Sequence, residues 1–66
     1  VTIVAFDQLE ATALALHPGS TLLDTDLDEA YGKYIYEVEL QDLDGIEWNV
    51  ELDALTGQVL KNHQDT

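Results

Sequence analysis

The sequence of 66 residues contains no cysteine, no methionine and no arginine, and its only basic residues apart from histidine are Lys33 and Lys61. Without cysteine there is no disulfide framework, no thiol nucleophile and no cysteine-based metal site. Against two lysines stand 14 acidic residues, which gives a formal net charge of −12. Such a chain cannot neutralise phosphate groups, which argues against binding to nucleic acid or directly to an anionic membrane. The expected partners are cations or basic protein surfaces.

Apolar residues make up 45% of the chain and recur in periodic runs, so the sequence predicts one folded domain over residues 1–66. A helix is expected over residues 8–16. Asp7 and Glu10 have the spacing of a capping box, with Phe6 placed as a hydrophobic staple on Ala11, and Pro18 ends the segment. The helix would carry two apolar stripes, one formed by Leu9, Ala13 and Leu16 and the other by Ala11, Leu14 and Ala15. One stripe faces a sheet, and the other requires a cover, for which a strand over residues 1–6, a second copy of the chain or a foreign partner are the alternatives.

Beyond Gly19 the chain alternates at strand period. Residues 20–28 predict a half-buried strand with Leu23, Thr25 and Leu27 inward and aspartates outward. Two stronger strands follow, and their inward residues are Tyr34, Tyr36, Val38, Leu40 and Ile46, Trp48, Val50, Leu52. The aromatic side chains among them are assigned to the core beneath the helix. Residues 58–60 form a last short extended segment, and residues 61–66 are expected to fray.

Parity fixes the register of the central hairpin, because directly opposed residues lie on the same face of a sheet. A three-residue loop at 43–45, with Gly45 in the left-handed region, preserves that parity. The predicted inward pairs are Asp42 with Ile46, Leu40 with Trp48, Val38 with Val50 and Tyr36 with Leu52. The outward pairs are Gln41 with Glu47, Glu39 with Asn49 and Glu37 with Glu51. The last pair opposes two carboxylates, which repel each other unless a cation is present.

The order of these segments resembles the PepSY domain family. The resemblance rests on an Ala-rich helix, Tyr36-Glu-Val-Glu-Leu40, the Asp44-Gly45 turn and, most specifically, Asp53-Ala-Leu-Thr-Gly-Gln-Val-Leu60. It spans residues 7–60. It implies an α+β fold, with one N-terminal helix packed on an antiparallel sheet of three to four strands. It also implies an exported module, secreted or periplasmic, of the kind found in propeptides of thermolysin-like metalloproteases and thought to restrain peptidases.

The residues offer little support for catalysis or metal binding. Ser20 is the sole serine, and no nucleophile has an adjacent base, so no catalytic residue is assigned. The run Asp24-x-Asp26-x-Asp28 resembles the start of a calcium loop but lacks the turn glycine, and the hairpin segment 42–47 lacks the first ligand. No metal ligand and no cofactor site is therefore predicted.

The outward face of the central hairpin is the predicted partner-binding surface. Its residues are Ile35, Glu37, Glu39, Glu47, Asn49 and Glu51. An apolar centre ringed by charged residues is typical of protein interfaces, and Ile35 supplies that centre. The sequence thus indicates a non-catalytic module that inhibits or regulates an exported peptidase, with a metallopeptidase as the expected partner. The alternatives are a structural or sensory domain of a larger exported or membrane-anchored protein, and a homodimer formed through the helix or an edge strand.

Overall fold

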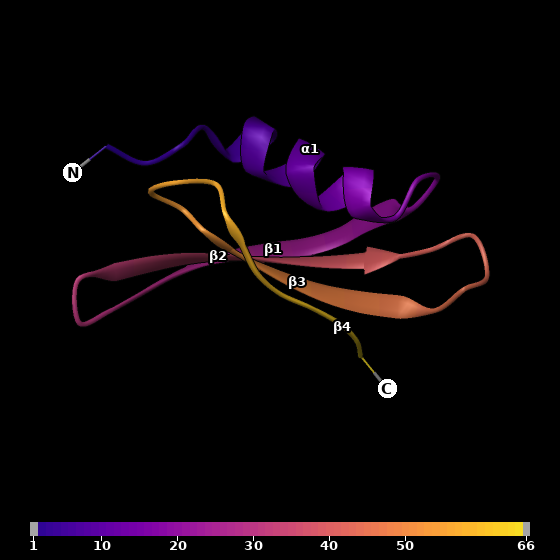
Figure 1. The fold of residues 1–66 in the computed structure, drawn as a ribbon. Helices are drawn as coiled ribbons and strands as arrows, with labels where there is room; N and C mark the ends of the chain where they lie inside the picture. Colours follow the sequence, from indigo (N-terminus) through magenta and orange to yellow (C-terminus); the bar gives the residue numbers. More distant parts are fainter. Residues whose placement is uncertain (1, 66) are drawn as a thin grey trace.

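The computed structural model describes residues 2–65. One helix, α1 (Phe6–Leu16), is followed by four strands, β1 (Thr21–Ala30), β2 (Lys33–Gln41), β3 (Glu47–Asp53) and β4 (Val59–Gln64). The strands form one antiparallel sheet in the order β1-β2-β3-β4. Figure 1 shows α1 lying across one side of this sheet, while nothing in the drawn chain covers the other side. The α+β prediction of one helix on an antiparallel sheet is confirmed, with four strands.

The core lies between α1 and the two central strands. Its fully buried side chains include Leu9 and Ala13 of the helix and alternate residues of the strands, namely Val38, Leu40, Val50 and Leu52. Alternation at period two places these residues on one face, as predicted. Tyr36 is buried, whereas Tyr34 and Trp48 are half-buried and pack against the core rim.

The register predicted for the central hairpin is confirmed at every pair. The structure opposes Leu40 to Trp48, Val38 to Val50 and Tyr36 to Leu52 on the inner side, and the predicted outward pairs also hold. Asp42 and Ile46 close the loop, since the Asp42 N–H donates to the Ile46 carbonyl at 2.9 Å. Gly45 has φ of 81°, a left-handed conformation that favours glycine. The carboxylate of Asp42 accepts hydrogen bonds from the backbone N–H groups of Asp44 and Ile46, which holds the turn closed.

The predicted helix start was wrong by two residues. Ala5 occupies the N-cap position and contributes no side-chain hydrogen bond, so Asp7 lies within the first turn, and its carboxylate accepts from the N–H of Gln8. The reason is tertiary: the ring of Phe6 stacks on Tyr36, with centroids 4.8 Å apart, and does not form a staple with Ala11. Packing of an aromatic residue thus outweighs the local capping preference.

Both ends of the chain differ from the sequence prediction. Residues 2–5 do not form a strand, although the Val4 N–H donates to the Ala54 carbonyl at 2.7 Å, and Val1 lies outside the described residues. The predicted frayed tail is instead part of β4 as far as Gln64. Polar contacts hold this strand, among them the bond between the His17 imidazole and Asn62 described below.

The half-buried strand predicted over residues 20–28 is also corrected. β1 begins at Thr21 and contains a bulge between Leu22 and Asp24, so Leu23 is an additional residue in the strand. Of the whole strand only Thr25 is half-buried, and the rest is exposed. The 11-residue helix lies over β2 and β3 and leaves the inward side chains of β1 uncovered.

Candidate functional site: the outer face of the sheet

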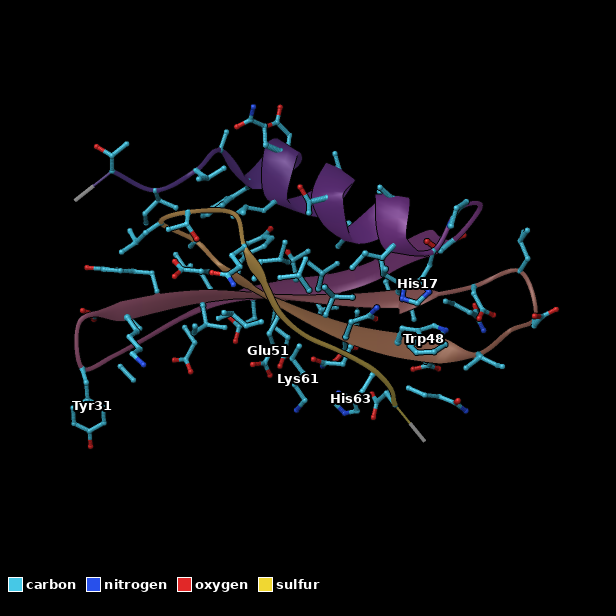
Figure 2. The ribbon with its side chains drawn as sticks, in the orientation of Figure 1. His17, Tyr31, Trp48, Glu51, Lys61 and His63 are labelled. Atoms are coloured by element: carbon cyan, nitrogen blue, oxygen red, sulfur yellow. The ribbon has the colours of Figure 1, made fainter. Side chains whose placement is uncertain are left out.

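The side of the sheet turned away from α1, here called the outer face, collects the outward residues of all four strands. The register gives its members as Thr21, Asp24, Asp26, Asp28, Ala30, Lys33, Ile35, Glu37, Glu39, Gln41, Glu47, Asn49, Glu51, Asp53, Lys61 and His63. All six residues predicted as a partner-binding surface belong to it. In Figure 2 the side chains of Glu51, Lys61 and His63 project from the sheet on the side opposite α1.

Cross-strand rows order these side chains. In one row Asp26, Glu37, Glu51 and Lys61 stand side by side. The predicted opposition of Glu37 to Glu51 is present, but its basic neighbour was not predicted, because Lys61 was expected in a frayed tail. The ammonium group of Lys61 lies 3.8 Å from the carboxylate of Glu51. Both side chains are partly exposed, so the ion pair stabilises the sheet little.

The next row contains Asp24, Glu39, Asn49 and His63. Partial burial in the sheet, and then repulsion from Asp24 and neighbouring carboxylates, raises the pKa of Glu39 above its ordinary value. The amide oxygen of Asn49 is buried and has no hydrogen-bond partner among the described residues. This row therefore combines a destabilised negative charge, which an incoming positively charged donor would relieve, with a buried acceptor that lacks a donor.

Ile35 lies in a third row, between Asp28 and Asp53. It is half-buried, not exposed as the sequence indicated, because it has a neighbouring strand on each side. Its position is at one end of the outer face, with the glutamates extending from it along β2 and β3. The outer face thus places this apolar residue beside several carboxylates, which are hydrogen-bond acceptors.

On the inner side a polar cluster closes the end of the core where α1 terminates. His17 follows the last residue of α1, and its imidazole stacks on Trp48 with ring centroids 4.4 Å apart. Its Nε2–H donates to the Asn62 amide oxygen at 2.8 Å, and the Trp48 indole N–H donates to the Asp42 carboxylate at 2.8 Å. The indole bond and the backbone bond from Ile46 lower the pKa of Asp42. Figure 2 shows the His17 side chain next to Trp48.

This cluster connects α1, the central hairpin and β4, and its side chains stack on or hydrogen-bond to one another. At the other end of the helix the Tyr36 hydroxyl donates to Glu10 at 2.7 Å, and burial raises the pKa of that hydroxyl. Residues 2–65 contain no grouping of histidine and carboxylate side chains suited to hold a metal ion. The same part of the chain has no helix with the length and apolar character needed to cross a membrane.

The helix was the competing surface in the sequence analysis. Leu9 and Ala13 of its first stripe are fully buried, while Leu16 is 41% exposed. In the second stripe Leu14 is half-buried, and Ala11 and Ala15 are exposed. The sheet therefore covers most of the first stripe, and the exposed apolar residues of the two stripes are Ala11, Ala15 and Leu16.

Comparison with known families decides the classification. The family described as "Peptidase propeptide and YPEB domain", PepSY, matches residues 3–63. The chain is a PepSY domain. This PepSY domain is 40% identical over 63 residues to the uncharacterized protein YkoJ of Bacillus subtilis (strain 168), an alignment that covers 94% of the chain and 37% of YkoJ. The domain thus spans little more than a third of the length of this relative. No solved structure matches it.

Proposed function

We propose that this PepSY domain is a non-catalytic binding module of an exported protein, secreted or periplasmic, and that it inhibits or regulates a peptidase through its outer face. The family description, which names peptidase propeptides, supports the class of partner. The observation that carries the proposal is the excess of acceptors on the outer face, where two lysines, Lys33 and Lys61, stand among many carboxylates. A partner that presents arginine and lysine side chains would relieve the repulsion and supply the missing donors.

The contact residues of this proposal are those predicted from the sequence: Ile35, Glu37, Glu39, Glu47, Asn49 and Glu51. Charge on such a surface acts mainly on the rate of encounter, and the half-buried apolar residue acts mainly on the lifetime of the complex. The partner class that fits is a peptidase with basic residues near its active-site cleft, and a metallopeptidase is the first to test.

The test is a titration of the domain into a purified thermolysin-like metallopeptidase, with hydrolysis of a peptide substrate as the readout. Peptidase activity should fall as the domain is added, and the inhibition should weaken as salt is raised. The double variant Glu37→Gln, Glu51→Gln should associate more slowly and respond less to salt. Ile35→Asp should dissociate about tenfold faster, a difference of about 1.4 kcal/mol, and Ile35→Thr tests the same position with a residue that suits a strand.

The helix supplies the matched control. A substitution of Leu9 would disrupt the core because this residue is fully buried. The control is therefore made at Leu16, which is 41% exposed. Leu16→Asp should inhibit the peptidase as the unsubstituted domain does. Inhibition that is lost in Leu16→Asp and retained in the outer-face variants would place the contact on the helix, against the proposal.

A second function is favoured by the length of YkoJ, of which the aligned region is 37%. In a longer exported or membrane-anchored protein the same face could dock on a neighbouring domain and serve a structural or sensory role without a peptidase target. The titration separates the two functions. A domain that leaves the metallopeptidase fully active at every concentration tested would support the second function and count against the first.

A further inference from the structure

The strand β1 is a long and uncovered edge of the sheet. It has 10 residues, stands at the end of the strand order, and pairs with β2 on one side. No strand within residues 2–65 pairs with its other side. Figure 1 shows β1 and β2 forming a hairpin that extends beyond the helix. An exposed edge of this length is a template for strand pairing.

The turn after β1 identifies which backbone groups point away from β2. Tyr31 and Gly32 have φ of 55° and 77°, as in a type I′ turn, so Ala30 and Lys33 form the hydrogen-bonded pair that closes the hairpin. Hydrogen-bonded and non-hydrogen-bonded pairs alternate from there. The N–H and C=O groups of Thr25, Leu27 and Glu29 therefore face the open edge. In agreement, the Thr25 N–H donates to the side chain of Asp24 at 2.9 Å.

The side of β1 that is continuous with the core carries Leu22 and Leu27 beside Thr25 and Glu29. Leu22 and Leu27 pair with the buried residues Leu40 and Tyr36, yet both leucines remain 38% exposed. The bulge residue Leu23 is 45% exposed. β1 thus leaves three leucines open to solvent, and an added strand would bury apolar side chains against them.

The other side of β1 carries Asp24, Asp26 and Asp28, which align with Glu39, Glu37 and Ile35 of β2. A second copy of the chain paired antiparallel through β1 would bring these three aspartates opposite another three. Like charges directly opposed destabilise a sheet, so charge disfavours a homodimer through this edge. A strand with basic side chains at every second position would complement them instead.

We propose that β1 is a docking edge for an extended peptide segment that pairs antiparallel with it, with apolar side chains toward the leucines and basic side chains toward the aspartates. All strand pairs in the sheet are antiparallel, and this added strand continues the pattern. The peptide's backbone supplies the hydrogen bonds, and its alternating side chains supply the specificity. This edge is separate from the outer-face residues of β2 and β3, so the proposal stands independently of peptidase binding.

Backbone methylation of a probe peptide tests the pairing directly. The probe is an alternating lysine-valine peptide of about eight residues, a common strand length, titrated into the domain by fluorescence anisotropy. In an antiparallel pair, the peptide residues opposite Thr25, Leu27 and Glu29 point their side chains to the same side of the sheet as these residues, which is the side of the leucines. The valines take these positions, so their N–H groups would bond to β1, while the lysine N–H groups would point outward. N-methylation of the valines should weaken binding by about tenfold or more, while N-methylation of the lysines should leave it nearly unchanged.

A matched pair of leucine variants locates the site. Leu27→Thr should weaken binding of the unmethylated peptide by about tenfold, whereas Leu60→Thr, at a leucine 49% exposed on the opposite edge strand, should not change it. Threonine suits a strand, and both leucines are already open to solvent, so both variants should fold. The double variant Glu47→Gln, Glu51→Gln, with both changes on β3, should retain binding, and this separates the edge from the outer-face site.

Four outcomes would overturn the proposal. Equal affinity for the two methylated peptides would show attraction by charge alone, and loss confined to the N-methyl-lysine peptide would exclude antiparallel pairing. Equal effects of Leu27→Thr and Leu60→Thr would exclude β1 as the site. A free domain that sediments as a dimer and becomes a monomer in Leu27→Thr would show that a second copy occupies the edge.

Discussion

On the side of the sheet that faces α1, Val38, Val50 and Leu52 are fully buried, whereas their sequence neighbours on the other side are Glu37, Glu39 and Glu51. The two faces are thus made by alternate residues of the same strands. The inner face excludes water and closes the core with aromatic stacks at both ends of the helix. The outer face gathers negative charge with one ion pair among the described residues. Stability resides on the first face, and the second is available for recognition at some cost to stability.

Two adjacent residues of β3, one on each face, should show the largest difference in their effect on stability. Leu52→Ala removes a fully buried side chain and should lower the free energy of unfolding by about 2–5 kcal/mol. That is comparable to the whole stability expected from a single small core. Glu51→Gln, one residue earlier, should change it by at most about 1 kcal/mol, because its ion pair with Lys61 is partly exposed. Urea unfolding of both variants measures the difference, and equal losses would contradict the division between the faces.

Two carboxylates should show opposite dependence of stability on pH. Asp42 has a lowered pKa, so its contribution is complete above the pKa of the unfolded chain and is lost as pH falls through the folded value. Asp42→Asn should therefore lower the melting temperature at neutral pH, with a gap to the unsubstituted domain that closes below about pH 4.

Glu39 has a raised pKa, so its ionised form opposes folding above that value. Glu39→Gln should melt at a higher temperature than the unsubstituted domain at neutral pH, and the gain should vanish as pH falls below about 4. Melting curves recorded across this range for both variants test the pair together. Shifts of the same sign for Asp42→Asn and Glu39→Gln at neutral pH would contradict the assignment.

The smallest effect is expected at the tip of the β1–β2 hairpin. Tyr31 has φ of 55° and a fully exposed side chain, which Figure 2 shows pointing away from the domain. A left-handed conformation is unfavourable for tyrosine, and asparagine is preferred at this position of a type I′ turn. Tyr31→Asn should stabilise the domain by about 0.5–1 kcal/mol in thermal unfolding. A loss of stability would show that Tyr31 makes a favourable contact in the folded domain.

The sequence was informative wherever alternation alone determines the geometry. Parity and the glycine turn sufficed for the register of β2 and β3, and hence for the membership of Ile35, Glu37 and Glu51 in one face. The helix start depended on stacking between Phe6 and Tyr36. These residues are far apart in the sequence, so no local capping signal reveals their contact.

Other features depended on contacts that leave no periodic signal. β4 has an almost wholly polar end, and its pairing with β3 brings Lys61 and His63 to the outer face. The exposure of β1 follows from the length and position of the helix, which packs mainly on the two central strands. The sequence alternates equally well in a covered and in an uncovered strand, so the open leucines of β1 could not be foreseen.

Repulsion among its carboxylates should make the outer face oppose folding while it has no partner. The most direct test is the melting temperature of the double variant Glu37→Gln, Glu39→Gln beside that of the unsubstituted domain, measured from low to high NaCl at neutral pH. Neither residue takes part in the ion pair with Lys61, so the substitutions remove repulsion alone. We expect a higher melting temperature for the variant at low salt and convergence of the two as salt screens the charges. A variant that melts at the same or a lower temperature at low salt would contradict this expectation.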